Sequence, residues 1–256
     1  MRRLILSGLA LACAFAGRAV AADMPVAVKA PPPPVWSWAA CYMGLNAGYG
    51  WGRDTVTNAS ETTAAGLVFA FTDFNFDSRG GFGGGQFGCN WQSAQAVFGI
   101  ETDIQAANVK GTILFPNAVF NFPNPLFSTS AQSELKYFGT VRGRIGYAFT
   151  PAAMLYVTGG FAYGGIDSSL FFPNILGEPG ATVRNTRYGY AAGAGWEALL
   201  TQRISVKAEY LYVDLGSGTR SFPITGDTFT WNERMKVHTV KLGVNFLWPW
   251  AVSARY

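Results

Sequence analysis

Between Val237 and Phe246, apolar residues alternate with polar or small ones along the whole segment. A period of two predicts a β-strand with one apolar face and one polar face. The pattern recurs along the chain, and it predicts eight strands over 41–52, 80–91, 94–106, 133–149, 153–167, 183–200, 203–215 and 234–248. The chain is therefore expected to be all-β.

The connections between these strands differ in length. Three are short: 92–93, 150–152 and 201–202. Four are long: 53–79, 107–132, 168–182 and 216–233. Short turns at one end and long loops at the other are typical of an up-and-down barrel in the outer membrane. We expect an eight-stranded antiparallel up-and-down transmembrane β-barrel with short periplasmic turns and long extracellular loops.

The membrane itself favours this fold over an open sheet. In hydrocarbon every backbone polar group must be paired internally, so that only helices and closed barrels can span. Beyond the N-terminus, no apolar run approaches the roughly 20 residues that a spanning helix needs. Of the two spanning structures, the barrel is the one expected.

Strand parity divides the side chains between lipid and lumen. In the strand over 133–149, Leu135, Tyr137 and Val141 are expected to face outward, and Lys136 and Thr140 inward. Across all strands, parity places four acids and four bases in the lumen: Glu101, Asp103, Arg142, Arg144, Glu197, Lys207, Glu209 and Lys241. Mutual pairing would make buried charge tolerable, which favours a polar plug. The alternative is a selectivity filter in a narrow porin-like channel for small solutes.

The N-terminus is typical of an exported protein. Arg2 and Arg3 precede an apolar core over 4–15 and the small residues Ala19-Val20-Ala21. We expect four segments: a signal peptide over 1–22, a Pro-rich periplasmic spacer over 23–38, the barrel over 39–248 and a short tail over 249–256. Cleavage would remove three of the 19 basic residues and leave 16 against 15 acidic ones. The basic balance therefore does not indicate nucleic acid as a partner.

Two cysteines remain after cleavage, Cys41 and Cys89. An even number in an oxidising compartment favours a disulfide. Cys41 opens the first predicted strand and Cys89 lies near the end of the second, so that antiparallel neighbours bring them to the periplasmic end on the same face. We predict a cross-strand disulfide, provided that the register brings the two Cα atoms within about 7 Å.

Few residues offer catalytic or metal-binding chemistry. The chain has one histidine, His238, which falls on the lipid-facing parity near the outer end of the last strand. The residues Gly83 to Gly88 match G-x-G-x-x-G, but a nucleotide cradle requires a helix to follow, and a curved barrel strand is the better explanation. We expect no enzyme activity, no catalytic residues, no cofactor and no metal.

Aromatic residues gather near strand ends and in the long connections. Six are expected to form a periplasmic girdle at the membrane interface: Trp36, Trp38, Tyr42, Trp91, Tyr147 and Trp248. The Phe-rich stretches 67–76, 113–127 and 170–176 have two interpretations. The favoured one is that strands continue above the membrane and the loops pack on each other; the other is an apolar surface for a host or cell partner.

Several stretches resemble the small outer-membrane barrel proteins of alphaproteobacteria, the porin-like family related to opacity proteins. They cover most of the mature chain: 42–52, 98–101, 141–147, 192–197, 207–212 and the last strand through Phe246. The resemblance implies an OmpA-like barrel in the cell outer membrane with a role in envelope integrity or surface contacts. Its expected partners are outer-membrane lipid, lipopolysaccharide and the barrel-assembly machinery.

The family's chains usually end on the aromatic residue of the last strand, which the assembly machinery is thought to recognise. Here residues 247–256 follow Phe246. Either Phe246 or the terminal Tyr256 serves as this signal, and the two alternatives stay open.

Overall fold

A computed structural model of the chain describes residues 36–115, 129–171, 180–224 and 227–249. These ranges contain nine strands: β1 (Ala40–Thr62), β2 (Val68–Ala70), β3 (Phe74–Ser93), β4 (Ala96–Phe115), β5 (Thr129–Thr150), β6 (Ala153–Phe171), β7 (Ala181–Leu199), β8 (Ile204–Ile224) and β9 (Asp227–Pro249). In the part of the chain that the structure describes, no helix is long and apolar enough to cross a membrane. The expected signal peptide, most of the expected spacer and nearly all of the expected tail lie outside the described residues.

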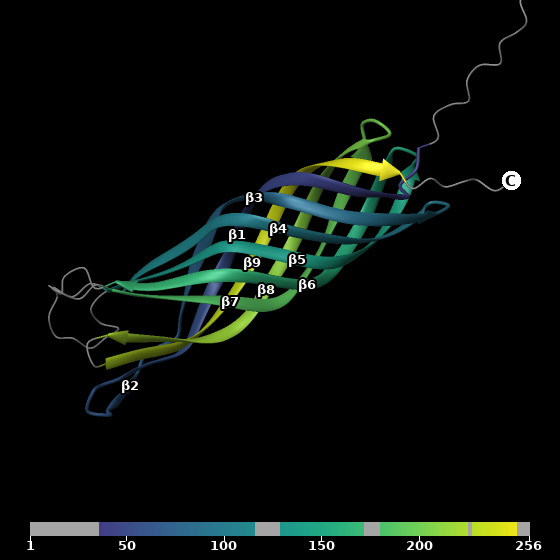
Figure 1. The fold of residues 1–256 in the computed structure, drawn as a ribbon. Helices are drawn as coiled ribbons and strands as arrows, with labels where there is room; N and C mark the ends of the chain where they lie inside the picture. The colour runs from purple at the N-terminus through teal and green to yellow at the C-terminus, as the bar shows by residue number, and fades with distance from the viewer. Residues whose placement is uncertain (1–35, 116–128, 172–179, 225–226, 250–256) are drawn as a thin grey trace, which may run out of the picture. The chain divides into compact units, whose positions relative to one another are not determined.

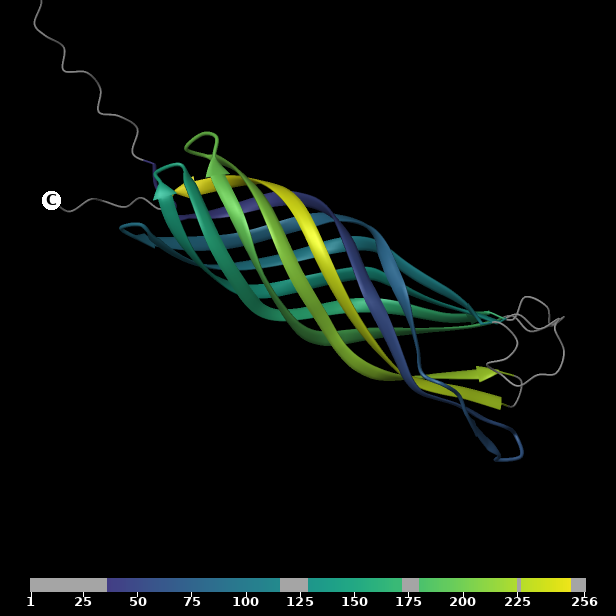
Figure 2. The same cartoon turned by 180° about the vertical axis from the view of Figure 1, so that it is seen from behind.

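Eight of the strands form one closed ring. Each strand from β3 to β9 pairs antiparallel with the next along the chain, and β1 pairs with both β3 and β9. The closing β1–β9 register runs from Ala40 opposite Pro249 to Thr62 opposite Thr228. Figures 1 and 2 show the strands winding obliquely around this ring, with β2 as a short addition that pairs with β1. The predicted up-and-down barrel is confirmed.

The strands are longer than the sequence pattern predicted. Each strand of the ring has 19 to 23 residues, whereas about ten suffice to cross a bilayer. The expected long loops over 53–79 and 216–233 are therefore largely strand, and those boundaries were wrong. The three expected short turns are present at one end, between Ser93 and Ala96, Thr150 and Ala153, and Leu199 and Ile204. This is the periplasmic end.

The outer face of the barrel carries an apolar band. On β9 the outward side chains Trp248, Phe246, Val244, Leu242 and Val240 are 41–65% exposed. Together with His238 they cover about ten residues of a tilted strand, which matches the apolar height of about 25 Å found in outer-membrane barrels. The next outward residues, Lys236 and Arg234, are charged and exposed. The extracellular part of the strand therefore begins just beyond His238.

A β-bulge changes the parity of β5. The β5–β6 register shifts between Leu135 and Tyr137, so that Leu135 lies in the lumen at 1% exposure while Lys136 and Tyr137 both face outward. The expectation that Leu135 faces lipid and Lys136 faces the lumen was wrong. An inserted residue reverses the alternation of every position beyond it.

The glycine-rich segment of β3 lies in a curved strand. At Gly84 a Cβ atom would come within 2.0 Å of the carbonyl oxygen of Ile104 on β4. Only glycine allows the two backbones to approach this closely. The segment continues as strand to Ser93, which confirms the barrel interpretation of the G-x-G-x-x-G match.

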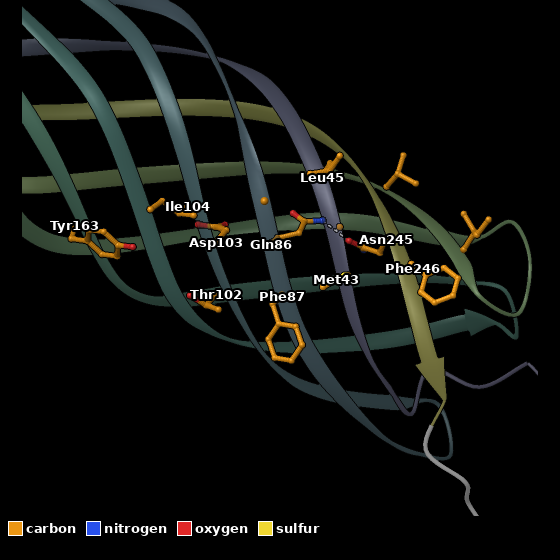
Figure 3. Close-up of a pocket in the computed structure, with 14 residues that line it drawn as sticks. Met43, Leu45, Gln86, Phe87, Thr102, Asp103, Ile104, Tyr163, Asn245 and Phe246 are labelled. Carbon is orange, nitrogen blue, oxygen red and sulfur yellow. Dashed lines mark hydrogen bonds between the residues drawn. The ribbon is translucent and has the colours of Figure 1, made fainter.

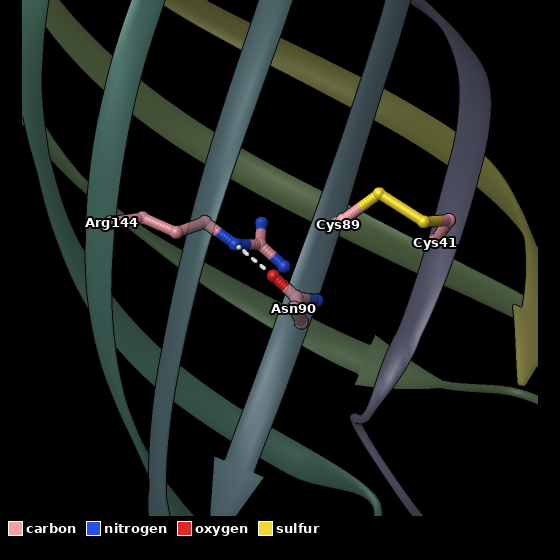
Figure 4. The surroundings of a disulfide bond; sticks show 4 residues. All are labelled: Cys41, Cys89, Asn90 and Arg144. Carbon is pink, nitrogen blue, oxygen red and sulfur yellow. Dashed lines mark hydrogen bonds between the residues drawn. A yellow bond between two sulfur atoms is a disulfide. The ribbon is translucent and has the colours of Figure 1, made fainter. Parts of the chain in front are cut away.

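Two of the three cysteines, Cys41 and Cys89, are joined. Cys41 on β1 lies directly opposite Cys89 on β3, and their sulfur atoms form a disulfide near the periplasmic end. Figure 4 shows that this bond links the two strands beside Asn90, which accepts a hydrogen bond of 2.8 Å from Nε of Arg144. The disulfide connects neighbouring strands at the periplasmic end, as predicted. It also lies next to the charged part of the lumen.

We expect that thiol labelling of the exported, folded protein finds no free thiols before reduction and two after it. Reduction, or a Cys41→Ser/Cys89→Ser variant, should lower the free energy of unfolding by about 2–4 kcal/mol because the unfolded chain loses a cross-link. Urea titration in lipid vesicles measures this change. Two free thiols in the untreated protein would contradict the pairing.

Candidate functional site: the filled lumen

The lumen is filled by side chains in layers of alternating polarity. The inward residues of β9 pass through all of them, and all are buried. From the periplasmic end these residues are Leu247, Asn245, Gly243, Lys241, Thr239, Val237, Met235, Glu233, Trp231 and Phe229. The order is apolar, polar, apolar, polar, apolar. We call these layers the lower seal, the lower charge layer, the middle seal, the upper charge layer and the upper seal.

The lower charge layer contains all eight charged residues that strand parity assigned to the lumen. None of them is more than 3% exposed. They come from five strands of the ring: Glu101 and Asp103 from β4, Arg142 and Arg144 from β5, Glu197 from β7, Lys207 and Glu209 from β8, and Lys241 from β9. β4 and β5 are neighbours, as are β8 and β9, so these side chains meet across the narrow interior.

Arg142 is the centre of this layer. Its Nη2 atom lies 2.7 Å from Oε1 of Glu101 and 2.9 Å from Oδ2 of Asp103. Its Nη1 atom lies 3.0 Å from Oε1 of Glu209. Its Nε atom donates a 2.8 Å hydrogen bond to Oγ1 of Thr140. One guanidinium therefore connects carboxylates from β4 and β8.

The other three cations balance the remaining negative charge. Nζ of Lys207 lies 2.7 Å from Oε2 of Glu101, and Nζ of Lys241 lies 2.7 Å from Oδ2 of Asp103. Nη1 of Arg144 lies 3.0 Å from Oε2 of Glu197. Charge-assisted bonds of this length are the strong kind, and they fix long side chains that would otherwise be mobile.

Neutral groups satisfy further carboxylate oxygens. The hydroxyls of Tyr42 and Tyr156 donate to Glu101 and Glu209, at 2.5 and 2.8 Å. The hydroxyl of Ser205 donates to Glu197 at 2.5 Å. A buried ionic network is tolerated when its members are hydrogen-bonded, and most groups of this layer are, although Nη2 of Arg144 has no hydrogen-bond partner among the described residues.

The lower seal includes two aromatic residues that were assigned to the interfacial girdle. Trp38 and Tyr42 are fully buried inside the periplasmic mouth, and that assignment was wrong. They pack with seven other buried residues: Ala40, Val97, Ala148, Met154, Tyr156, Leu199 and Leu247. Tyr42 occupies an inward-facing position of β1, and Trp38 precedes that strand. Trp91, Tyr147 and Trp248 do face outward.

The middle and upper seals are also continuous apolar clusters. The middle seal contains Phe82 and Phe138, packed edge to face at 5.2 Å, with Val109, Leu135, Ile166 and others. The upper seal gathers Phe76, Leu170, Phe222, Phe229 and Trp231, and Phe71 and Phe74 pack against it. The favoured expectation for the Phe-rich stretches is thus met for 71–76, and most of 113–127 lies outside the described residues.

The upper charge layer was not found from the sequence. Glu233 on β9 receives Nε of Arg220 at 3.0 Å, Nη2 of Arg187 at 3.4 Å and the hydroxyl of Ser168 at 2.8 Å. These residues lay in or beside segments that were expected to be loops. The signal was present, because the alternation Phe229, Trp231, Glu233, Met235, Val237 continues without a break.

Asp54 is the least satisfied member of this layer. It is fully buried and forms no ion pair among the described residues, and the nearby Ser78 hydroxyl is its weak polar neighbour. Burial raises the pKa of Asp54 well above its usual range, and the nearby negative charge of Glu233 raises it further. Asp54 follows Arg53, the first charged outward residue of β1 above the apolar band, so it lies on the extracellular side of that band.

The remaining sequence-predicted residues lie on the outer face. His238 faces outward near the extracellular edge of the apolar band, with Nδ1 2.6 Å from Oη of Tyr210. Phe246 faces outward near the periplasmic edge and packs edge to face on Trp248 at 5.2 Å. Among the described residues, no group of three or more His, Cys, Asp or Glu side chains could hold a metal ion.

A groove of about 710 Å³ lies along the outer wall of the barrel. Outward residues such as Leu45, Phe87, Ile104 and Val244 line it. Figure 3 shows Gln86 and Asn245 among the residues that line this groove. Nε2 of Gln86 donates a buried hydrogen bond of 2.5 Å to Oδ1 of Asn245. The groove faces the membrane.

Comparison with known proteins identifies the family. The family described as outer membrane protein beta-barrel domain matches residues 9–246, nearly the whole chain. The chain belongs to this family. It is therefore an integral protein of the cell outer membrane, and its charges pair inside the barrel.

Two curated relatives and one solved structure place the chain among its neighbours. The 31 kDa outer-membrane immunogenic protein of Brucella melitensis is 32% identical, over 96% of this chain and 99% of its own. The 22 kDa outer membrane protein of Rhizobium leguminosarum is 30% identical, over 85% of this chain and 82% of its own. The outer membrane protein OprG from Pseudomonas aeruginosa superimposes with a TM-score of 0.46 at 10% identity, over 83% of this chain and 97% of its own.

Replacing Arg142 by Gln should destabilise the barrel by about 3–5 kcal/mol, because it leaves buried carboxylates without their shared cation. The matched control is Arg53→Gln. Arg53 pairs with Asp77 at 3.2 Å, but both side chains are at least 68% exposed. The control should change stability by less than about 1 kcal/mol. Urea titration in vesicles measures both, and equal effects would contradict the central role of Arg142.

Asp54→Asn should stabilise the protein at neutral pH by about 1 kcal/mol, because it removes an unpaired buried charge. A carboxyl with a raised folded-state pKa binds its proton more tightly when folded. The wild type should therefore gain stability as the pH falls through the folded-state pKa toward the usual carboxyl range, and Asp54→Asn should lose that slope. Unfolding midpoints measured from pH 8 to pH 5 test this. A steeper slope in the variant would refute it.

Proposed function

We propose that this protein is a structural barrel of the outer membrane, with a closed lumen and a role in envelope integrity. The observation that carries the proposal is the layered interior, in which three apolar seals separate two charge layers. An eight-stranded ring leaves room for side chains and little else. Such a barrel strengthens the outer membrane without opening a path through it.

A narrow channel for small solutes is the second candidate, and the layers argue against it. Conduction requires a continuous polar path with binding sites weak enough to release the solute. In this lumen the cations and carboxylates bind each other, and apolar clusters lie on both sides of each charge layer. A mixed-sign lining also gives no selection for one sign of ion.

An enzymatic role has little support from the side chains present. The family relatives compared above are named as outer-membrane proteins. His238 is the sole histidine, and it faces the membrane beside Tyr210. Without a second histidine, a Ser-His-Asp triad would have to use this one, which points away from any polar cluster of the lumen.

The partners follow from the position in the membrane. We propose contacts with outer-membrane lipid and lipopolysaccharide along the outer face, and recognition by the barrel-assembly machinery during insertion. Phe246 suits an assembly signal because it is the outward aromatic residue near the end of the last strand, and the family match ends there. The alternative signal, Tyr256, lies outside the described residues. A surface or host partner would bind through the extracellular loops.

Planar-bilayer recording tests the closed lumen. We expect the purified wild type to give no steady openings, and Arg142→Gln to stay closed as well because the apolar seals remain. Heat-modifiable gel migration confirms that both proteins are folded. Steady, reproducible openings of the wild type whose conductance changes in Arg142→Gln or Glu101→Gln would replace the structural role with a channel.

A further inference from the structure

A belt of basic side chains surrounds the barrel just above the apolar band. Within the described residues, the outward side chains at this level include seven bases: Arg53, Arg79, Lys110, Lys136, Arg184, Arg234 and Lys236. They include four acids: Asp77, Glu134, Asp167 and Asp214. The belt therefore has a positive net charge at the height where lipid headgroups begin.

Three of the four acids of the belt lie close to the wall, whereas the bases extend from it. The fourth acid, Asp77, is 76% exposed and pairs with Arg53. The side chains of Glu134, Asp167 and Asp214 are 12%, 16% and 1% exposed. The basic partners of these acids are much more exposed, from 44% for Lys110 to 80% for Arg184. The exposed part of the belt is thus more positive than the net charge of all its residues suggests.

Two pairs of bases face each other directly across strands. Arg79 on β3 lies opposite Lys110 on β4, and Arg53 on β1 lies opposite Lys236 on β9. Like charges in this arrangement destabilise a sheet. Arg79 and Lys236 form no ion pair within 4 Å in the described part of the chain, although Asp214 on β8 lies opposite Lys236 and its charge partly offsets that of the lysine. An external anion between the strands would remove the repulsion.

We propose that Arg53, Arg79, Lys110 and Lys236 bind the phosphate group of an outer-leaflet lipid. We call these four residues the basic patch. Arginine and lysine bind phosphate through charge-assisted hydrogen bonds, and basic residues near an anionic membrane surface are attracted to it. This inference rests on the proposed contacts between the outer face and outer-membrane lipid. It adds that the outer face prefers lipids that carry phosphate.

The surface below the basic patch favours a lipid over a soluble polyanion. Trp51 lies directly opposite Arg79, and with Tyr49 it marks the interface between headgroups and hydrocarbon. Beneath Arg79 the next outward positions of β3 are Gly81, Gly83 and Gly85, which leave open wall for an acyl chain. A lipid whose phosphate binds at the basic patch can thus lay its acyl chains along this apolar surface. A soluble polyanion would make no use of this apolar surface.

Binding of a defined lipid to the folded full-length protein tests the proposal. The probes are diphosphorylated lipid A and its dephosphorylated counterpart, added to protein in a nonionic detergent and measured by native mass spectrometry. Wild type should prefer the phosphorylated lipid. Arg79→Gln/Lys236→Gln should lower the apparent affinity for it by about tenfold or more, because two phosphate contacts are lost.

The matched control removes the same charge elsewhere. Arg184→Gln/Arg203→Gln takes one base from β7 and one from the periplasmic turn before β8. Its affinity for the phosphorylated lipid should stay within about twofold of wild type, because neither residue belongs to the basic patch. Heat-modifiable migration verifies that every variant is folded.

Thermal unfolding supplies a second readout that a structural role would not reproduce. Without lipid, Arg79→Gln/Lys236→Gln should unfold at or above the wild-type midpoint because the repulsion is gone. Diphosphorylated lipid A should raise the wild-type midpoint and raise that of the variant much less. Equal binding by the variant, or equal binding of dephosphorylated lipid, would overturn the proposal. So would inorganic phosphate that stabilises as strongly as the lipid. A conducting lumen would refute the proposed function and leave this result unaffected.

Discussion

Hydrocarbon offers no hydrogen-bond partner to a peptide group, and the rest of this structure follows from that constraint. A sheet can enter the membrane only if its two edge strands pair with each other, as β1 and β9 do from Ala40 to Thr62. Closing eight strands sets the width of the ring. A ring this narrow must be filled by its own side chains, so that closure decides the contents of the interior as well as its shape.

The polar and charged groups of the interior must then find their partners within the barrel. Charged residues cannot remain ionised in a closed space unless each finds a counter-charge, and Arg142 provides one for carboxylates on β4 and β8. The same ion pairs connect strands that are not neighbours in the ring, whereas the backbone ladders connect only neighbours. The lower charge layer therefore resists flattening of the barrel, and the apolar seals on either side keep water away from it.

Much of this arrangement could be predicted from the sequence, because a period of two is a simple rule that holds wherever a strand is regular. It gave the strand order, the ring and the inward position of the charges on β4, β5, β7, β8 and β9. It failed where the rule is interrupted. The bulge at Leu135 reversed the parity of β5, and Trp38 reaches the lumen from outside any strand. The upper charge layer was missed because strand ends were placed at the membrane boundary. The alternation through Phe229 and Glu233 shows that these strands continue well into the extracellular space.

The three apolar seals act as barriers in series. A permeability defect requires a continuous file of water, and a substitution that loosens the packing of Phe82 or Trp38 interrupts only one of three dry segments. The barrel therefore stays closed when one seal is loosened. Its stability has no such reserve, since every lost contact lowers the free energy of unfolding. Sequence drift inside such a barrel is limited first by its folding, and only much later by the passage of solutes.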